Sequence, residues 1–106
     1  MAQYQAAVRL RPDYAEAHTN LGIILAQVPG QLPHAVTEFQ SALRVTPNSA
    51  RAHANLGYVL ARIPGKTSEA VAEYEAALRI SPDPAVQQQL NQLRSIATAR
   101  GGVRPN

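Results

Sequence analysis

The chain has 106 residues, no cysteine and no tryptophan, and its 10 Lys and Arg exceed its 7 Asp and Glu by three. The lack of cysteine excludes disulfide frameworks, thiolate zinc sites and thiol nucleophiles. The longest run without a polar side chain, 21–26, is far shorter than the roughly 18 residues that a membrane helix needs. The N-terminus also lacks the pattern of a secretion signal, so we expect one small soluble domain, with a cytoplasmic location favoured.

Self-comparison reveals a repeat with an offset of 35 residues between 15–49 and 50–84. About half of the paired positions are identical, and the apolar residues of both copies recur three and four positions apart, which predicts helices. A Pro-Gly pair divides each copy, at Pro29 and Gly30 and again at Pro64 and Gly65. Each unit is therefore predicted to be two helices joined by a tight turn.

In chain order, the register predicts five segments. Residues 1–12 match the second helix of a truncated unit, 13–47 and 48–82 are complete units, 83–100 form a capping helix, and 101–106 form a flexible tail. Each junction carries a proline that ends one helix and an N-cap oxygen for the next: Pro12 and Asp13, Pro47 and Asn48, Pro82 and Asp83. The expected fold is all-α, with about six helices.

The similarity to the repeat becomes weak over residues 83–100. The apolar residues of this segment form one stripe, opposite a glutamine-rich polar face, as expected of a helix that caps an array. The stripe consists of Val86, Leu90, Leu93 and Ala97. Small residues recur where facing helices would approach closely: Gly22 and Gly57, Ala35 and Ala70, Ala42 and Ala77.

These motifs resemble the tetratricopeptide repeat family over about residues 1–84. The resemblance rests on Asn-Leu-Gly in the first helix of each unit, Ala-Val-x-Glu-(Phe/Tyr)-x-x-Ala-Leu-Arg in the second, and the proline that follows. It implies a right-handed superhelix of antiparallel helix pairs, whose first helices line a concave groove that binds peptides. A period of 35 also fits pentatricopeptide RNA readers, but both signatures belong to the tetratricopeptide family, so nucleic acid is an unlikely partner.

Three features depart from the family pattern. Histidine replaces the bulky aromatic residue of the first helix, leucine replaces the tyrosine two turns later, and the period is one residue longer than usual. The positions are His18 and His53 for the aromatic residue, and Leu25 and Leu60 for the tyrosine.

Helical geometry predicts that the first-helix residues off the apolar stripe face the groove. They are Glu16, Thr19, Asn20, Ile23 and Gln27 in the first unit, and Arg51, Ala54, Asn55, Tyr58 and Arg62 in the second. The family's clamp for a terminal carboxylate needs a lysine where this chain has Thr19 and Ala54, so a full clamp is not expected.

Asn20 and Asn55 are the strongest candidates for peptide contact. An amide both donates and accepts, so it can pair with a peptide backbone without reading its sequence. The string Ala-x-Ala-His-x-Asn-Leu-Gly is similar to repeats of O-linked N-acetylglucosamine transferases, which implies an asparagine ladder of this kind. The alternative is that both amides bond the neighbouring repeat, and the sequence leaves the two readings open.

Arg51 and Arg62 would give the groove a basic stretch that favours an acidic partner. The alternative is that both are ordinary solvated surface residues. Solvation is the better explanation for Arg9, Arg44 and Arg79, which are expected to form a column on the convex side.

The histidines His18, His34 and His53 are candidates for metal or acid–base chemistry. Two occupy the packing position of the family aromatic residue, and no carboxylate recurs beside them at a useful spacing. We therefore expect packing residues, no metal, no cofactor and no catalysis: the chain is predicted to be a scaffold for a protein or peptide partner.

The competing function is self-association. If residues 1–12 are a second helix without its first-helix partner, the stripe of Tyr4, Val8 and Leu10 lacks part of its cover. End-to-end stacking or helix swapping between two chains would hide it and form a homo-oligomer. The same half-unit suggests that the chain was cut from a longer array.

Overall fold

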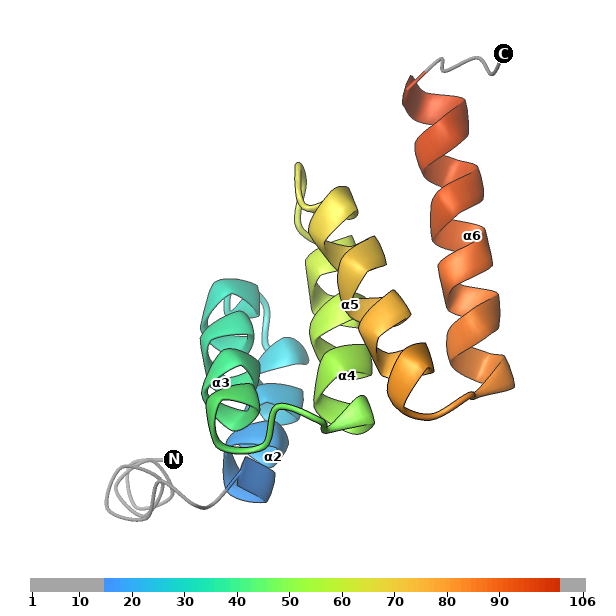
Figure 1. The fold of residues 1–106 in the computed structure, drawn as a ribbon. Coiled ribbons are helices and arrows are strands. Elements are labelled where there is room, and N and C mark those ends of the chain that lie inside the picture. Colours follow the sequence, from blue (N-terminus) through green and yellow to red (C-terminus); the bar gives the residue numbers. More distant parts are fainter. Residues whose placement is uncertain (1–14, 102–106) are drawn as a thin grey trace.

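The structure is a computed structural model that describes residues 15–101, with side chains described as far as Ile96. It contains five helices over this range (Figure 1): α2 (Ala15–Ala26), α3 (Leu32–Val45), α4 (Ala50–Ala61), α5 (Thr67–Ile80) and α6 (Pro84–Gly101). The all-α prediction is confirmed. The helix expected over residues 1–12 lies outside the described residues, and Gly101, expected in the tail, is the last residue of α6.

The helices pack as consecutive pairs. The closest neighbours are α2 with α3 and α4 with α5, while α3 packs on α4 and α5 packs on α6. Figure 1 shows the resulting row, in which α6 lies beside α5 and its C-terminal half extends past the other helices. This is the helix-pair stacking expected of a solenoid, in which each unit contacts only its neighbours.

The turn inside each pair repeats closely. Gly30 and Gly65 have φ values of 83° and 85°, in the left-handed region that glycine adopts without steric cost. After each glycine, a backbone N–H donates to the carbonyl of the residue two positions past the end of the preceding helix, from Gln31 to Val28 and from Lys66 to Ile63, both at 3.1 Å. The Pro-Gly pair thus positions the second helix of each unit against the first.

The helix N-caps agree with the sequence prediction at one junction and differ at another. Asp83 Oδ1 accepts from the Ala85 N–H at 2.9 Å, and α6 begins at Pro84 as expected. At α4 the cap is Ser49, not Asn48: the Ser49 hydroxyl accepts from the Ala52 N–H at 3.1 Å. Both residue types can cap a helix, and α4 begins one residue later than expected, which selects the serine.

The core is built from small residues facing large ones. Phe39 on α3 is only 1% exposed, and its ring lies against Gly22 on α2. Tyr74 contacts Gly57 in the same way in the second unit. The alanines expected at close approaches are all buried: Ala35, Ala42, Ala70 and Ala77. On α6, Leu90 and Leu93 are buried and Val86 packs against the same core, which confirms the described part of its stripe.

Gly22→Ala is expected to destabilise the fold by about 1–3 kcal/mol, although alanine favours a helix more than glycine does. A Cβ at Gly22 would lie 2.7–2.9 Å from three ring carbons of Phe39, a buried side chain with little room to move. Denaturant unfolding measures the loss. Gly57→Ala is the matched control, because its nearest contacts are 3.1–3.2 Å and its loss should be smaller. A Gly22→Ala variant as stable as the wild type would contradict this packing.

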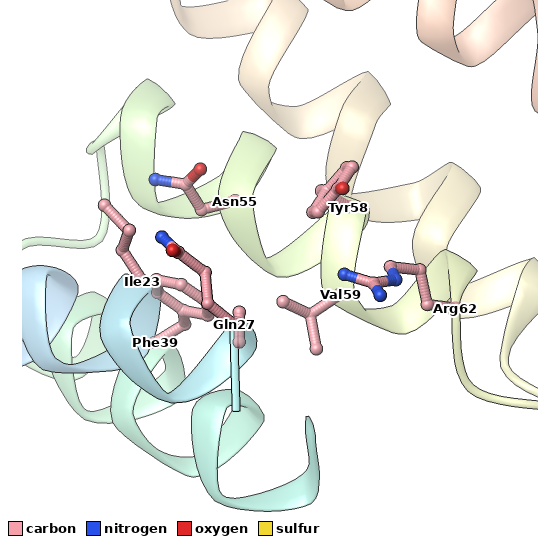
Figure 2. A pocket seen from close by; sticks show the side chains of 8 residues that line it. Ile23, Gln27, Phe39, Asn55, Tyr58, Val59 and Arg62 are labelled. Carbon is pink, nitrogen blue, oxygen red and sulfur yellow. The ribbon is translucent and has the colours of Figure 1, made fainter. Parts of the chain in front are cut away.

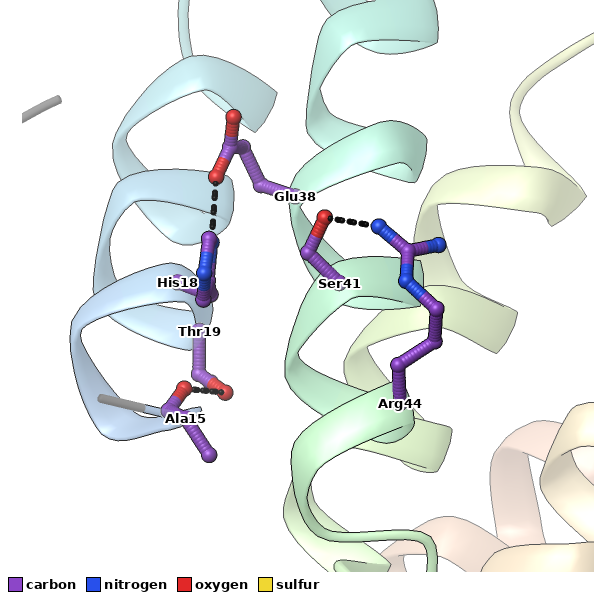
Figure 3. A network of polar contacts seen from close by, with 6 residues as sticks. All are labelled: Ala15, His18, Thr19, Glu38, Ser41 and Arg44. Atoms are coloured by element: carbon purple, nitrogen blue, oxygen red, sulfur yellow. Dashed lines mark hydrogen bonds and ion pairs between the residues drawn. The ribbon is translucent and has the colours of Figure 1, made fainter. Parts of the chain in front are cut away.

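Each histidine of the first helices pairs with a glutamate on the second helix of the same unit (Figure 3 shows the first pair). Nδ1 of His18 lies 2.9 Å from Oε1 of Glu38, and Nδ1 of His53 lies 2.7 Å from Oε1 of Glu73. Nε2 of His53 also lies 2.9 Å from the carbonyl oxygen of Pro47. The expectation that no carboxylate recurs beside these histidines is therefore wrong. The partners are 20 residues away because the chain turns back between the helices, and both members recur at the repeat offset.

Glu73→Ala is expected to cost about 1–2 kcal/mol, because it removes the carboxylate that contacts Nδ1 of the largely buried His53 side chain. The control is Glu75→Ala on the same helix. The Glu75 side chain pairs with Arg94 and is 40% exposed, against 26% for Glu73. A surface pair of this kind contributes about 0–1 kcal/mol. Thermal unfolding compares the two variants, and an equal or larger loss for Glu75→Ala would show that the His53 pair adds no stability.

Candidate functional site

A pocket of about 280 Å³ opens between α2 and α4, the first helices of the two units. We call it the α2–α4 pocket. Its walls are apolar and come from Ile23, Phe39 and Val59, with Ala26 beside them. Polar side chains surround the opening: Gln27, Asn55, Tyr58 and Arg62. In Figure 2 the amides of Gln27 and Asn55 lie on one side of the opening, and Tyr58 and Arg62 lie on the other.

Helix periodicity explains how α4 forms its side of the pocket. Asn55, Tyr58, Val59 and Arg62 are spaced three, four and seven positions apart, so they share one face of the helix. Phe39 on α3 also lines the pocket. Phe39 and Val59 are each only 1% exposed, so the pocket reaches the edge of the core at these residues, and a repeat pattern carries no signal for such a gap between two units.

Tyr58 and Arg62 form a pair at the opening. The guanidinium carbon of Arg62 lies 5.5 Å from the centroid of the Tyr58 ring, within the range of a cation–π contact. Tyr58 is 47% exposed, which is high for a large aromatic side chain. The pair presents an aromatic face and a positive charge to anything that enters the pocket.

The two asparagines differ in environment. Arg51 Nη2 donates to Asn20 Oδ1 at 3.2 Å, so Asn20 bonds the neighbouring repeat, which is the alternative that the sequence left open. Asn55 instead lines the pocket. The reason lies in the repeat itself: the residue 31 positions after Asn55 is Val86, whose side chain has no donor.

Thr19 differs from its expected place in the groove. It is only 4% exposed, and its hydroxyl donates to the Ala15 carbonyl at 3.0 Å, one turn earlier in α2 (Figure 3). This bond within the helix satisfies the hydroxyl and lets the side chain be buried. Thr19 is therefore absent from the exposed groove surface.

The remaining candidates are placed as follows. Ile23, Gln27, Asn55, Tyr58 and Arg62 meet in the α2–α4 pocket. Arg51 is exposed on the first turn of α4 and holds Asn20. The residues expected to mediate self-association lie outside the described residues: Tyr4, Val8 and Leu10.

The chemistry of the α2–α4 pocket is that of binding. An apolar interior can take an aliphatic or aromatic side chain, while the surrounding amides and guanidinium orient polar groups. Among the side chains described up to Ile96, no group of three or more His, Asp or Glu residues gathers where a metal ion could bind. None of the helices over residues 15–101 combines the length and hydropathy of a membrane-spanning segment.

Comparison with known proteins adds one match. A family model described as TPR repeat matches residues 1–28 and 30–63. Among curated proteins, none matches the chain significantly. The match covers more than half of the chain, and it includes α2, α3, α4 and both Asn-Leu-Gly motifs. The chain therefore belongs to the tetratricopeptide repeat (TPR) family.

Proposed function

We propose that this protein binds a segment of a partner protein in its concave groove, with an apolar side chain of that segment anchored in the α2–α4 pocket. TPR repeats generally mediate protein–protein interaction and are typically non-catalytic scaffolds. The observation that carries the proposal is the pocket itself, where residues expected in the groove surround an apolar cavity of about 280 Å³.

The polar surroundings of the pocket support a peptide as the ligand. Gln27 and Asn55 each offer a donor and an acceptor, so they can pair with a peptide backbone in either direction. Tyr58 is a rigid, exposed aromatic side chain, the kind of residue that contributes most binding energy at interfaces. Of the two asparagines expected to form a ladder, Asn55 is the one we assign to the backbone of the ligand.

The charges favour an acidic segment. Arg51 and Arg62 are both exposed, in the first turn and at the C-cap of α4, and they add two positive charges to the groove. Glu16 on α2 adds one negative charge. Arginine pairs with carboxylates through two parallel hydrogen bonds, and Arg62 is already held over the Tyr58 ring. We therefore expect the partner segment to combine an apolar anchor with nearby Asp or Glu residues.

Selection from a random peptide library followed by fluorescence anisotropy tests the proposal. Peptides selected on the wild-type chain are measured against the double variant Tyr58→Ala/Arg62→Ala. The matched control is Arg44→Ala/Arg79→Ala, which removes two exposed arginines from the second helices α3 and α5. We expect at least about tenfold weaker binding to the pocket variant, because it loses an aromatic contact and a charge.

Two results would contradict the proposal. One is equal affinity of the selected peptides for the wild type and for the Tyr58→Ala/Arg62→Ala variant. The other is a loss of binding in the Arg44→Ala/Arg79→Ala control, which would place the ligand on the second helices. Circular dichroism of each variant verifies that its fold is retained.

Self-association is a second candidate function, and an exposed apolar face of α2 favours it. Ile24 is 46% exposed, whereas its counterpart in the next unit, Val59, is 1% exposed. Val28 is also exposed, while its counterpart Ile63 packs against the core. A second copy of the chain could cover this face through an apolar surface of its own. Light scattering at high concentration tests this function: a monomer would exclude it, and a dimer that Ile24→Ser abolishes would support it.

A further inference from the structure

A second pocket lies on the other side of Asn55. It also encloses about 280 Å³, and it opens between α4, the end of α5 and the start of α6. We call it the α4–α6 pocket. Its lining consists of Ala50, Arg51, Ala54, Asn55, Ala77, Ser81, Asp83 and Val86. The repeat pattern predicts only a capping role for α6, yet its first turn forms one wall of this pocket.

We propose that the α4–α6 pocket is a second side-chain subsite of the groove. It takes an aliphatic residue of the same peptide whose anchor occupies the α2–α4 pocket, and the inference rests on the function proposed above. Asn55 lines both pockets, so its amide lies where the peptide backbone would pass between the two side chains.

The lining explains why an aliphatic residue fits. Ala50, Ala54 and Ala77 are small side chains, which leave the volume open, and Val86 adds a branched apolar wall. Asp83 lies at the edge and is held in place, because its Oδ1 accepts the Ala85 N–H. Asp83 and Arg51 bring opposite charges to this lining, whereas Arg62 has no acidic residue beside it in the lining of the α2–α4 pocket, so the acidic residues of the peptide belong nearer to Arg62.

The spacing of the two pockets along α4 limits the peptide. The α2–α4 pocket uses residues 58, 59 and 62 of α4, and the α4–α6 pocket uses residues 50, 51 and 54. Asn55 belongs to both sets, so their centres lie about six residues, or about 9 Å, apart along the helix. The pockets also lie on opposite sides of α4, which adds a lateral distance of about one helix spacing, so the combined separation is about 13 Å. An extended peptide advances about 3.3 Å per residue and returns a side chain to the same face at every second position. Two side chains four positions apart, about 13 Å, match the offset and the face.

The probes for this test are three synthetic peptides of glycine and serine that carry one aspartate next to a leucine. The first peptide has that leucine alone. The second has another leucine four positions away from it, and the third has the other leucine directly beside it. Fluorescence anisotropy gives each affinity for the full chain. Methyl NMR resolves the site, because Ile23 and Val59 report on the α2–α4 pocket and Val86 reports on the α4–α6 pocket.

The test variant is Ala54→Phe, which fills the α4–α6 pocket from α4 and leaves the α2–α4 lining unchanged. The matched control is Ala72→Phe, which adds the same side chain at an exposed position of α5 that lines neither pocket. The two-dimensional NMR spectrum of each variant establishes that it is folded.

We expect the peptide with two leucines four positions apart to bind about tenfold more tightly than the other two peptides, since it buries one more leucine. It should shift the methyl signals of both pockets, and Ala54→Phe should remove the tenfold gain while Ala72→Phe keeps it. Equal affinities for the three peptides, or a gain that survives in Ala54→Phe, would overturn the second subsite alone. No binding of any peptide would contradict the proposed function as well.

Discussion

Phe39→Ala is expected to lower the free energy of unfolding by about 3–5 kcal/mol, the largest effect of any single substitution considered for this fold. The ring is 1% exposed and fills the space above Gly22, which has no side chain to move into the resulting cavity. A domain of this size has a total stability of about 5–15 kcal/mol, so the variant should unfold at a much lower denaturant concentration.

Val45→Ala is the control for this loss. Val45 lies at the end of the same helix and is 36% exposed, so its truncation should cost less than about 1 kcal/mol. A loss below about 1 kcal/mol for Phe39→Ala would contradict the packing of the first unit. Phe39 also lines the α2–α4 pocket. Phe39→Leu should therefore weaken peptide binding under conditions in which this variant is still folded.

The fold is expected to lose stability above pH 10 because of Tyr74. Burial, with a smaller contribution from the charge of ionised Tyr58, raises the pKa of Tyr74 to about 12. In the unfolded chain a tyrosine has a pKa of about 10. The folded state therefore holds the Tyr74 proton more tightly than the unfolded chain does. The contribution of Tyr74 to the free energy of unfolding is complete below pH 10 and is lost as the pH rises from 10 to 12. The total loss is roughly 2–3 kcal/mol.

Tyr74→Phe is the matched variant, and the chain itself supports it, since Phe39 occupies the equivalent position of the first unit. Other groups titrate in the same pH range, so the relevant quantity is the difference in unfolding free energy between the two proteins from pH 9 to pH 11.5. The difference should shift in favour of Tyr74→Phe as the pH rises. A difference that stays constant over this range would show that the Tyr74 hydroxyl ionises as easily in the fold as outside it.

Much of the fold was predictable because a helix pair is a local structure. The apolar spacing and the Pro-Gly pairs indicated the helices and their turns, and positive φ values at Gly30 and Gly65 explain the choice of glycine. The small residues at helix approaches were also predictable, since the pattern repeats. The choice of Ser49 over Asn48 as the N-cap was not, because both side chains can accept the same hydrogen bond.

The candidate site was predictable only in part. Helical geometry placed Ile23, Asn55 and Tyr58 on the surface where the α2–α4 pocket opens. It failed for Thr19, whose hydroxyl bonds within its own helix, and it could not separate Asn20 from Asn55. That difference depends on which side chain the next unit offers, and it becomes visible only when the units are placed side by side.

The pairs of His18 with Glu38 and His53 with Glu73 show what a fuller use of the repeat could have found. All four residues recur at the offset of 35, with the same spacing of 20 inside each unit. Two polar residues that recur together are candidates for a contact when a turn brings their helices side by side. A search for recurring pairs, rather than for short spacings, would have predicted these bonds.

A methyl NMR titration tests the proposal that the α2–α4 pocket binds an apolar side chain of an acidic peptide. The chain is titrated with a peptide selected from the library, and the signals of Ile23 and Val59 are followed together with those of Val45 and Ile80 at the ends of the second helices. If the proposal holds, saturable shifts appear at Ile23 and Val59, and Tyr58→Ala/Arg62→Ala weakens them. Saturable shifts at Val45 or Ile80, with Ile23 and Val59 unmoved, would contradict it.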